Sequence, residues 1–245
     1  MKVIKPGYEI LRPRFERVGA KDDVYSILEE SGRTCYKSEA AITPESSASF
    51  ITKLNSNHHE AMLEHAIMTV RFTIDRGVSH ELVRHRLASF AQESTRYCNY
   101  SKDKFGNEIT VIEPCFFKKD LFYIWVNDDD PFLKAAKDAP SDVKKYVIWY
   151  NSCKVAEDRY FMLLNEGATP QEARSVLPNS LKTEVVMTAN MREWRHFFEL
   201  RAAGTTGAPH PQMAEVALPL LREVADYMPE LFGDILEIAE GKNHG

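Results

Sequence analysis

The sequence predicts an α+β domain that is mostly helical and has few strands. Helices are indicated by segments with apolar residues at helical spacing that follow a capping signal, as after Thr43-Pro44-Glu45. Strands are indicated by strict alternation in residues 66–75 and by β-branched residues in residues 181–190. A length of 245 residues suits one large domain, or two small ones that share a core.

The first half of the chain predicts two helices with a strand between them. The helix after Thr43 should turn three apolar residues inward, Phe50, Ile51 and Leu54. The strand should bury one face, made of Met68, Val70, Phe72 and Ile74. A short helix then follows Gly77, capped by Ser79 or Asp75, with an inward face made of Val78, Leu82 and Val83. We expect residues 84–97 to continue from the end of this helix as a loop of small residues.

The second half predicts mainly helices. Residues 101–140 are the least regular part, with a strand in residues 109–114 and helical pieces around Leu121–Trp125 and Pro131–Lys137. A long helix should run from a capping Ser141 to about Asn165, with apolar positions at Val147, Tyr150, Val155, Phe161 and Leu164. Residues 191–201 predict a helix with Met191, Trp194 and Phe198 on the core side and Arg192 and His196 on the opposite face. Two amphipathic helices, separated near Pro229, should occupy residues 211–239.

The composition limits the classes of function. A hydrophobic fraction of 44% and a charged fraction of 27% are typical of a globular protein. The net charge of -5 argues against a general nucleic-acid binder, so any anion must be held by a local group of arginines. The chain contains no apolar run long enough for a membrane span, and its N-terminus does not resemble a signal peptide. We therefore expect a cytoplasmic protein, in which the widely spaced cysteines stay reduced: Cys35, Cys98, Cys115 and Cys153.

A group of histidines, His58, His59 and His65, has Glu60 and Glu64 beside it and invites interpretation as a metal site. The spacing does not match the zinc-protease pattern, in which two histidines lie four residues apart on a helix. Polar residues at a helix end and loop explain His58 and His59 better, so we predict no metal site.

Residues 84–97 concentrate positive charge. Arg84, His85 and Arg86 project in three directions from a helix end, and Ser89, Ser94 and Thr95 then supply hydroxyl groups. Arginine forks match phosphate oxygens, and the backbone amides of a small-residue loop can bind the same anion. The alternative is a solvated loop in which Arg86 or Arg96 pairs with Glu81 or Glu93.

Further arginines stand in similar contexts, namely Arg174, Arg192 beside Asn190, and Arg201. Arg201 alone could simply cap the C-terminal end of a helix. Together with the first group, however, these side chains could bind two or three phosphate-bearing ligands. The sequence has neither a GxGxxG motif nor a Walker loop, so a dinucleotide would be bound outside a Rossmann fold.

The chain resembles the flavin-dependent thymidylate synthases (ThyX). Their hallmark is Arg-His-Arg, seven residues, then Ser, ending in Arg-Tyr, and the segment from Arg84 to Tyr97 has this spacing. The resemblance extends in order through Glu64-His65 before a strand, the segment ARSVLP at residues 173–178, and Asn190, Arg192, His196 and Arg201.

The resemblance implies an activity and a fold. The family makes dTMP from dUMP, with 5,10-methylenetetrahydrofolate as carbon donor, reduced and tightly bound FAD as hydride donor, and NADPH to reduce the flavin again. It implies a homotetramer whose active sites are shared between subunits, built from helices packed around an antiparallel sheet. It further implies one domain over residues 1–245, with an insertion around residues 101–140, and neither a nucleic-acid nor a membrane partner.

The resemblance also assigns residues. Those implied to bind FAD are His65, Arg84, His85, Arg86, Gln92, Asn190, Arg192 and His196. Those implied to bind dUMP are Glu81, Arg84, Gln92, Glu93, Ser94, Thr95, Arg96, Arg174 and Arg201. Arg201 would be the catalytic residue, because a guanidinium beside the uracil can stabilise the negative charge that spreads through the ring when C5 becomes nucleophilic. Ser94 would bind phosphate or sugar and would not attack the substrate.

Four positions depart from the family pattern. Gln92 stands where glutamate is common, and Glu81 where glutamine is. Met191 replaces the usual alanine of the Asn-Ala-Arg triplet, and Ile67 replaces a hydroxyl residue that often meets the flavin. Two alternative functions remain open from the residues alone, a metal-dependent hydrolase using His58, His59 and His65, and a module that binds RNA or nucleotides through the arginines.

Overall fold

The computed structural model describes residues 1–15, 19–117 and 140–241. The chain divides into two compact units. Unit 1 consists of Met1–Pro6, Ile74–Ser79 and Gln92–Glu184, and unit 2 of Gly7–Thr73, His80–Ala91 and Val185–Gly245. That residues 1–245 form a single domain stays a prediction.

Most residues of a four-stranded sheet belong to unit 2. Its strands are β2 (Gly7–Arg12), β3 (Ile67–Asp75), β6 (Lys182–Asn190) and β4 (Ala88–Gln92), in that spatial order. β2 and β3 are antiparallel, with Gly7 opposite Thr73, and their register shifts between Ile10 and Arg12. The alternation predicted for β3 is confirmed, because Met68, Val70, Phe72 and Ile74 are all buried.

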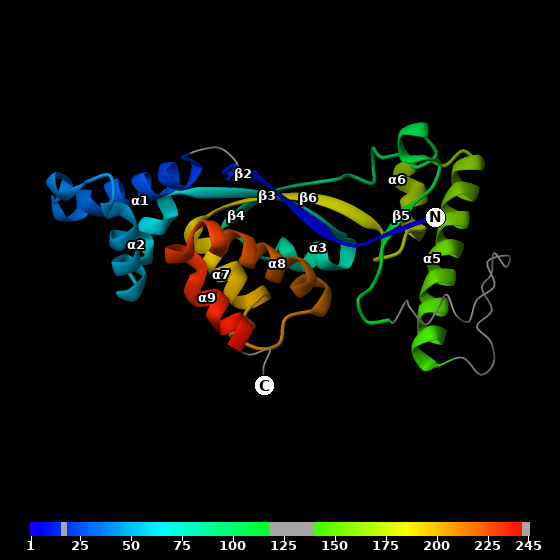
Figure 1. Ribbon diagram of the computed structural model, residues 1–245. Coiled ribbons are helices and arrows are strands. Elements are labelled where there is room, and N and C mark those ends of the chain that lie inside the picture. Colours follow the sequence, from blue (N-terminus) through cyan, green and yellow to red (C-terminus); the bar gives the residue numbers. More distant parts are fainter. Residues whose placement is uncertain (16–18, 118–139, 242–245) are drawn as a thin grey trace. The chain divides into compact units, whose positions relative to one another are not determined.

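The helices of unit 2 build its core. They are α1 (Ala20–Tyr36), α2 (Ser46–Ser56), α7 (Met191–Arg201), α8 (Pro211–Tyr227) and α9 (Pro229–Gly241), with short 3-10 helices η1 (Glu39–Ala41) and η2 (Glu60–His65). In Figure 1, α7, α8 and α9, coloured yellow to red, lie side by side on one side of the sheet. Trp194, Phe197 and Phe198 of α7 are fully buried, and Phe198 meets Phe232 of α9 edge to face at 5.5 Å. This aromatic packing fixes α7 against its neighbours.

Unit 1 contains a two-stranded parallel sheet of β1 (Lys2–Ile4) and β5 (Thr110–Ile112). Its helices are α5 (Ser141–Asn165), α6 (Pro170–Ala173), and the 3-10 helices η3 (Asp103–Phe105) and η4 (Arg174–Val176). A core of apolar residues joins β5 to α5 and α6, including Val111, Cys153, Tyr160 and Ala173. Helix α3 (Arg76–Leu82) begins in this unit, where Asp75 Oδ1 accepts the Val78 N–H at 2.6 Å, as the predicted capping requires.

The main helices and strands were predictable from local patterns. The helices at residues 46–56, 141–165 and 191–201 are confirmed, as are the strand within residues 109–114 and the break near Pro229. Within residues 101–140, the two predicted helical pieces lie outside the described residues.

Several details of the prediction are wrong. Residues 88–92 were predicted as loop but form strand β4, because they hydrogen-bond to β6, a partner distant in sequence that a local pattern does not reveal. The parallel pair β1–β5 was not anticipated either. Val83, predicted to face inward, is 40% exposed, and Val155, named as an apolar position of α5, is 42% exposed. Pro140, with no side-chain hydrogen bond, takes the capping position expected of Ser141.

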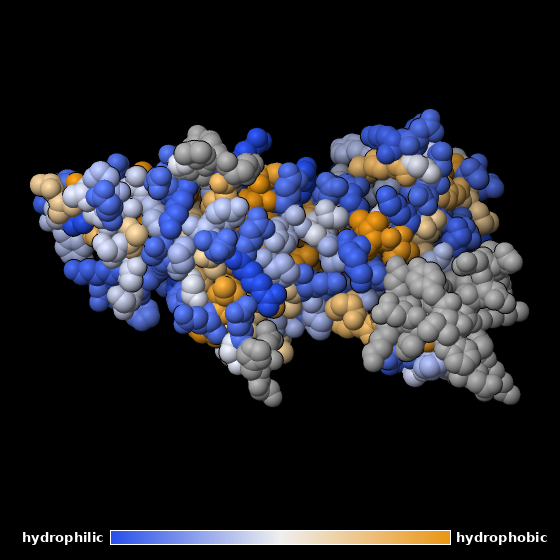
Figure 2. All heavy atoms as spheres, in the orientation of Figure 1, coloured by the Kyte–Doolittle hydropathy of each residue, from blue (hydrophilic) through white to orange (hydrophobic). Residues whose placement is uncertain are grey.

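The surface reflects the charged composition. Hydrophilic residues predominate on the visible face of α1 and α2, interrupted by small separate hydrophobic groups (Figure 2). Among the described residues, no helix combines the length and apolar character needed to cross a membrane.

The burial of Phe198 gives a first prediction. Phe198→Ala should lower the free energy of unfolding by about 3–5 kcal/mol, because it removes a ring that joins α7 to α9 and leaves a cavity. Urea denaturation measures the change. Ile238→Ala, at an exposed site on α9, is the control and should change the free energy by no more than about 0.5 kcal/mol. Equal losses in the two variants would contradict the assigned core.

Candidate active site

Unit 2 contains a cavity of about 1040 Å³, at the upper end of the range of about 300–1,000 Å³ that is usual for small-molecule sites. Its charged and polar lining comes from η2, from the end of α3 with the turn after it, and from α7. These side chains include Glu60, Glu64, Glu81, Arg84, His85, Arg86, Asn190, Arg192, Glu193, Arg195, His196, Glu199 and Arg201. A loop after α7, residues 206–210, closes one side.

Arg201, the last residue of α7, is fixed by three hydrogen bonds in this cavity. Its Nη1 donates to Glu81 Oε2 at 3.0 Å, and its Nη2 to the Glu81 carbonyl oxygen at 3.3 Å. Its Nε donates to His85 Nε2 at 3.3 Å. Because a guanidinium carries five N–H donors, these three bonds leave two donors for a ligand.

His85 is buried behind Arg201, with 4% of its surface exposed. Its Nδ1 lies 3.1 Å from Glu193 Oε1, and its ring meets Phe197 edge to face. The bond from Arg201 requires Nε2 to be an acceptor, so the ring proton of the neutral imidazole must lie on Nδ1 and point to Glu193. Glu193, His85 and Arg201 thus form a continuous hydrogen-bonded chain.

The electrostatics of the pair agree with a neutral ring. The pKa of His85 is lowered from 6.5 to about 4, mainly by burial and further by the positive charges of Arg201 and His196. Burial also raises the pKa of the Glu193 carboxyl, against the opposing effect of His196.

Two arginines of the cavity are available to an anion. Arg84 and Arg86 are exposed and line the cavity, and within the described ranges neither forms an ion pair. Arg192, by contrast, donates from Nη1 to Glu64 Oε1 at 2.7 Å and lies 3.6 Å from Glu60. The turn after α3 therefore presents two positive charges without a described ion-pair partner to the cavity.

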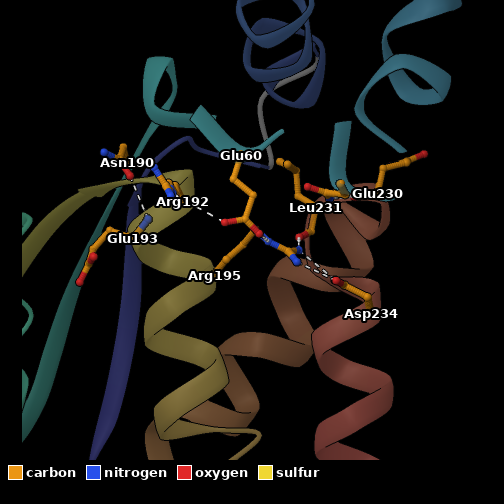
Figure 3. A network of polar contacts seen from close by, with 9 residues as sticks. Glu60, Asn190, Arg192, Glu193, Arg195, Glu230, Leu231 and Asp234 are labelled. Carbon is orange, nitrogen blue, oxygen red and sulfur yellow. Dashed lines mark hydrogen bonds and ion pairs between the residues drawn. The ribbon is translucent and has the colours of Figure 1, made fainter. Parts of the chain in front are cut away.

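The N-terminal end of α7 also opens on the cavity. Asn190 Oδ1 caps the helix by accepting the Glu193 N–H at 2.8 Å, as Figure 3 shows. A helix N-terminus presents backbone N–H groups and a partial positive charge, which favours an anion there. Asn190, Arg192 and His196 are all part of the lining, with Arg192 and His196 exposed.

A polar network holds α7 in place (Figure 3). Arg195 is buried, with two bonds to Asp234 of α9 at 2.9 and 2.6 Å and a third to the Leu231 carbonyl. Glu60 of η2 lies 3.9 Å from Arg195 and also faces Arg192. This network ties α7 to both α9 and η2.

His65 is placed differently from the other residues implied to bind FAD in this unit. It ends η2, is exposed, and does not line the cavity, whereas Glu60 and Glu64 of the same short helix do.

Sequence reasoning missed three charged residues of the lining. It did not single out Glu193, Arg195 or Glu199, although all three belong to the predicted helix that carries Arg192 and Arg201. The only available signal was their helical spacing from those residues, and spacing does not reveal a partner such as His85.

The remaining predicted residues lie in unit 1. The Gln92 amide donates to Ser79 Oγ and Thr183 Oγ1 at 3.0 and 3.2 Å, and the Glu93 carboxylate accepts from Lys182 at 2.9 Å. Both side chains are thus engaged within the protein.

Ser94, Thr95, Arg96 and Arg174 gather in the same unit. Ser94 Oγ accepts the Arg96 N–H at 3.3 Å, and Arg174 Nη1 donates to Thr95 Oγ1 at 3.2 Å. Arg96 and Arg174 are both exposed. These residues supply two cations and two hydroxyl groups on neighbouring segments, a donor set that suits a phosphate.

The histidines considered as metal ligands do not gather. His58, His59 and His65 are exposed. In the described part of the chain there is no group of three or more His, Cys, Asp or Glu side chains placed to hold a metal ion.

The fold and the cavity define an α+β protein with a cavity lined by arginines, glutamates and histidines. Comparison with known proteins gives its family. Residues 19–230 match the family model described as thymidylate synthase complementing protein. The chain belongs to this family.

Similar proteins carry one name. A flavin-dependent thymidylate synthase of Mycobacterium avium is 32% identical over 225 residues, which cover 88% of this chain and 82% of that protein. A protein of the same name from Corynebacterium aurimucosum is 34% identical over 221 residues, with the same coverage.

Solved structures share the fold. The UMP/dUMP methylase PolB of Streptomyces cacaoi, bound with 5-Br UMP, has a TM-score of 0.69 at 20% identity and covers 98% of this chain and 97% of its own. The same enzyme bound with 5-Br dUMP has a TM-score of 0.69 at 23% identity, over 95% and 96% of the two chains.

The buried His85 predicts a pH dependence of stability. Its folded pKa of about 4 lies below the ordinary 6.5, so the unfolded chain binds more protons between these values. The stability that neutral His85 contributes should be complete above pH 6.5 and should be lost as the pH falls through 4. The charged and titratable groups that face the ring are Glu193, Arg201 and His196.

Denaturant titrations of the wild type and His85→Gln from pH 4 to 8 test this. The difference in free energy of unfolding between the two should shrink toward low pH. His80→Gln, at an exposed histidine of α3, the helix that precedes His85, should follow the wild-type curve. A difference that stays constant over this range would contradict a neutral buried ring.

Proposed function

We propose that the protein is a flavin-dependent thymidylate synthase that methylates dUMP to dTMP. The carbon donor is 5,10-methylenetetrahydrofolate, and NADPH reduces the flavin. Family membership and the shared name of the relatives support the reaction. The observation that carries the proposal is Arg201, held by Glu81 and His85 in an arginine-rich cavity with two N–H donors left for a ligand.

The cavity residues fit FAD. Arg84 and Arg86 are exposed cations without ion pairs in the described ranges, and the N-terminal end of α7 adds the partial positive charge of the helix dipole, which together suit a diphosphate. When bound, the reduced flavin supplies the hydride. The residues proposed to hold it are His65, Arg84, His85, Arg86, Gln92, Asn190, Arg192 and His196.

The residues proposed to bind dUMP combine arginines with polar groups. They are Glu81, Arg84, Gln92, Glu93, Ser94, Thr95, Arg96, Arg174 and Arg201. The bond between Arg174 and Thr95, beside Ser94 and Arg96, supports a phosphate-binding role for this group. The Glu93 carboxylate is already paired with Lys182.

Arg201 activates the substrate electrostatically. Placed beside the uracil, its guanidinium stabilises the negative charge that develops as C5 attacks the carbon donor. Its three bonds within the protein hold it before the reaction begins, so little reorganisation is required.

No covalent attack by the protein is required. Ser94 Oγ is used as an acceptor for the Arg96 N–H, and the stretch from Arg84 to Tyr97 contains no cysteine. Ser94 therefore serves as a phosphate or sugar ligand.

We further propose a cytoplasmic homotetramer with shared active sites. Size-exclusion chromatography with light scattering measures the mass against 28.0 kDa for one chain. The absorption spectrum and an assay of dTMP formation test the main proposal. Flavin bands and dTMP formation from dUMP are expected, whereas a colourless protein that takes up no added FAD would overturn it.

Arg201→Ala should abolish dTMP formation while FAD still binds, because the variant removes the group that stabilises the developing charge. Initial rates and flavin absorbance are measured on the same sample. Arg222→Ala is a matched control, since Arg222 is an exposed arginine of α8 that pairs with Glu240 outside the cavity. Full activity of Arg201→Ala would refute the assigned role.

A further inference from the structure

We propose that Glu193 is a positioning residue for Arg201 and acts through His85. This inference rests on the proposed function, because it concerns the residue proposed to activate dUMP. Glu193 does not belong to the residues that the family motif singled out, and its role follows from the hydrogen-bonded chain in unit 2.

The first step is that the Glu193 carboxylate has a single hydrogen-bond partner among the described residues, His85. Its backbone N–H is capped by Asn190, while its Oε1 meets His85 Nδ1 at 3.1 Å, and no other bond to the carboxylate exists among the described residues. In Figure 3 the Glu193 side chain points away from the Arg195 network. It therefore contributes neither to the helix cap nor to the attachment of α7 to α9.

The second step is that burial makes this carboxylate costly. Glu193 is 6% exposed and His85 is 4% exposed. A buried polar group without a partner costs free energy, so two such groups remain together only when they satisfy each other. Glu193 and His85 meet this condition.

The third step fixes the proton. With Nδ1–H donated to Glu193, His85 presents a bare Nε2 to the Arg201 Nε–H. The other tautomer would set two N–H donors against each other. Without an acceptor at position 193, the Nδ1–H of the buried ring has no partner. The tautomer whose Nε2 accepts the Arg201 Nε–H is then less favoured.

The fourth step is that Arg201 has two anchors, Glu81 and His85. Glu81 holds the two terminal nitrogens, and His85 holds Nε from the other side of the group. Loss of the second anchor allows the guanidinium to rotate about its bonds to Glu81. Since catalytic groups must be held closely to act, the rate of the chemical step should depend on Glu193.

The experiment compares Glu193→Leu with Glu193→Gln. Leucine removes the acceptor, and we expect kcat to fall by about 10- to 100-fold, with a smaller change in KM for dUMP. Glutamine retains a side-chain carbonyl that can accept the Nδ1–H, so it should recover most of kcat. Glu193→Leu with wild-type kcat would overturn the proposal, as would Glu193→Gln that is as impaired as Glu193→Leu.

A double-mutant cycle separates positioning from general stability. In the Arg201→Lys background, Glu193→Leu should cause no further loss of kcat, because lysine lacks the Nε–H that His85 accepts. Equal losses in both backgrounds would mean that Glu193 acts on folding alone. Glu29→Leu is the matched control. Glu29 is also a buried glutamate of unit 2, bonded to Arg33 and Ser46 away from the cavity, and its loss should lower stability without changing kcat per folded molecule.

A structural measurement keeps the inference independent of the assay. Crystal structures of the wild type and Glu193→Leu should show that the bond between Arg201 Nε and His85 Nε2 is lost in the variant. An unchanged bond would refute the positioning role even if no dTMP were formed. Conversely, a wild type that forms no dTMP would refute the proposed function while leaving this measurement valid.

Discussion

The site depends on one constraint, the fixed orientation of α7 about its own axis. Arg195 is buried and bonded to Asp234 and the Leu231 carbonyl, and a buried charge that lost these partners would destabilise the protein strongly. Trp194 and Phe198 are fixed by the aromatic core on an adjacent face. With these two faces committed, the helical period determines the third. Arg192 and His196, four residues apart, therefore share a face that lines the cavity, whereas Arg201 lies about two turns after Glu193, on the side of α7 that meets His85.

Ion pairing explains how several arginines are held around one cavity. Most of the arginines around the cavity are compensated, Arg192 by Glu64, Arg195 by Asp234 and Arg201 by Glu81. Such pairing holds each side chain in one geometry but also reduces its field. Arg84 and Arg86, unpaired within the described ranges, carry the remaining charge toward a ligand. The unpaired arginines that can attract an anion thus lie at the turn after α3. The paired arginine whose side chain is held in one position lies at the end of α7.

The sequence was sufficient for what depends on short-range patterns. Alternation identified β3, and helical spacing identified α5 and α7, the latter with Met191, Trp194 and Phe198 on its buried face. It failed where the partner is distant in the chain, as for β4, whose residues look like a loop until β6 lies beside them. The site follows the same rule. Arg84, His85 and Arg201 were found through motif spacing, but the contact of His85 with Glu193, 108 residues away, required the folded chain.

A neutral imidazole between Glu193 and Arg201 differs physically from a second carboxylate in that place. Two carboxylates on one guanidinium would fix it but would also make the cluster anionic, and an anionic nucleotide would then be repelled. His85 accepts the Nε–H without adding negative charge next to Arg201, while the Glu193 charge lies one ring further away. The hydrogen-bonded series Glu193–His85–Arg201 therefore holds the Arg201 guanidinium from two sides. Only one adjacent carboxylate, that of Glu81, offsets its positive charge. That combination suits the role proposed for Arg201, which is to meet negative charge that appears only during the reaction.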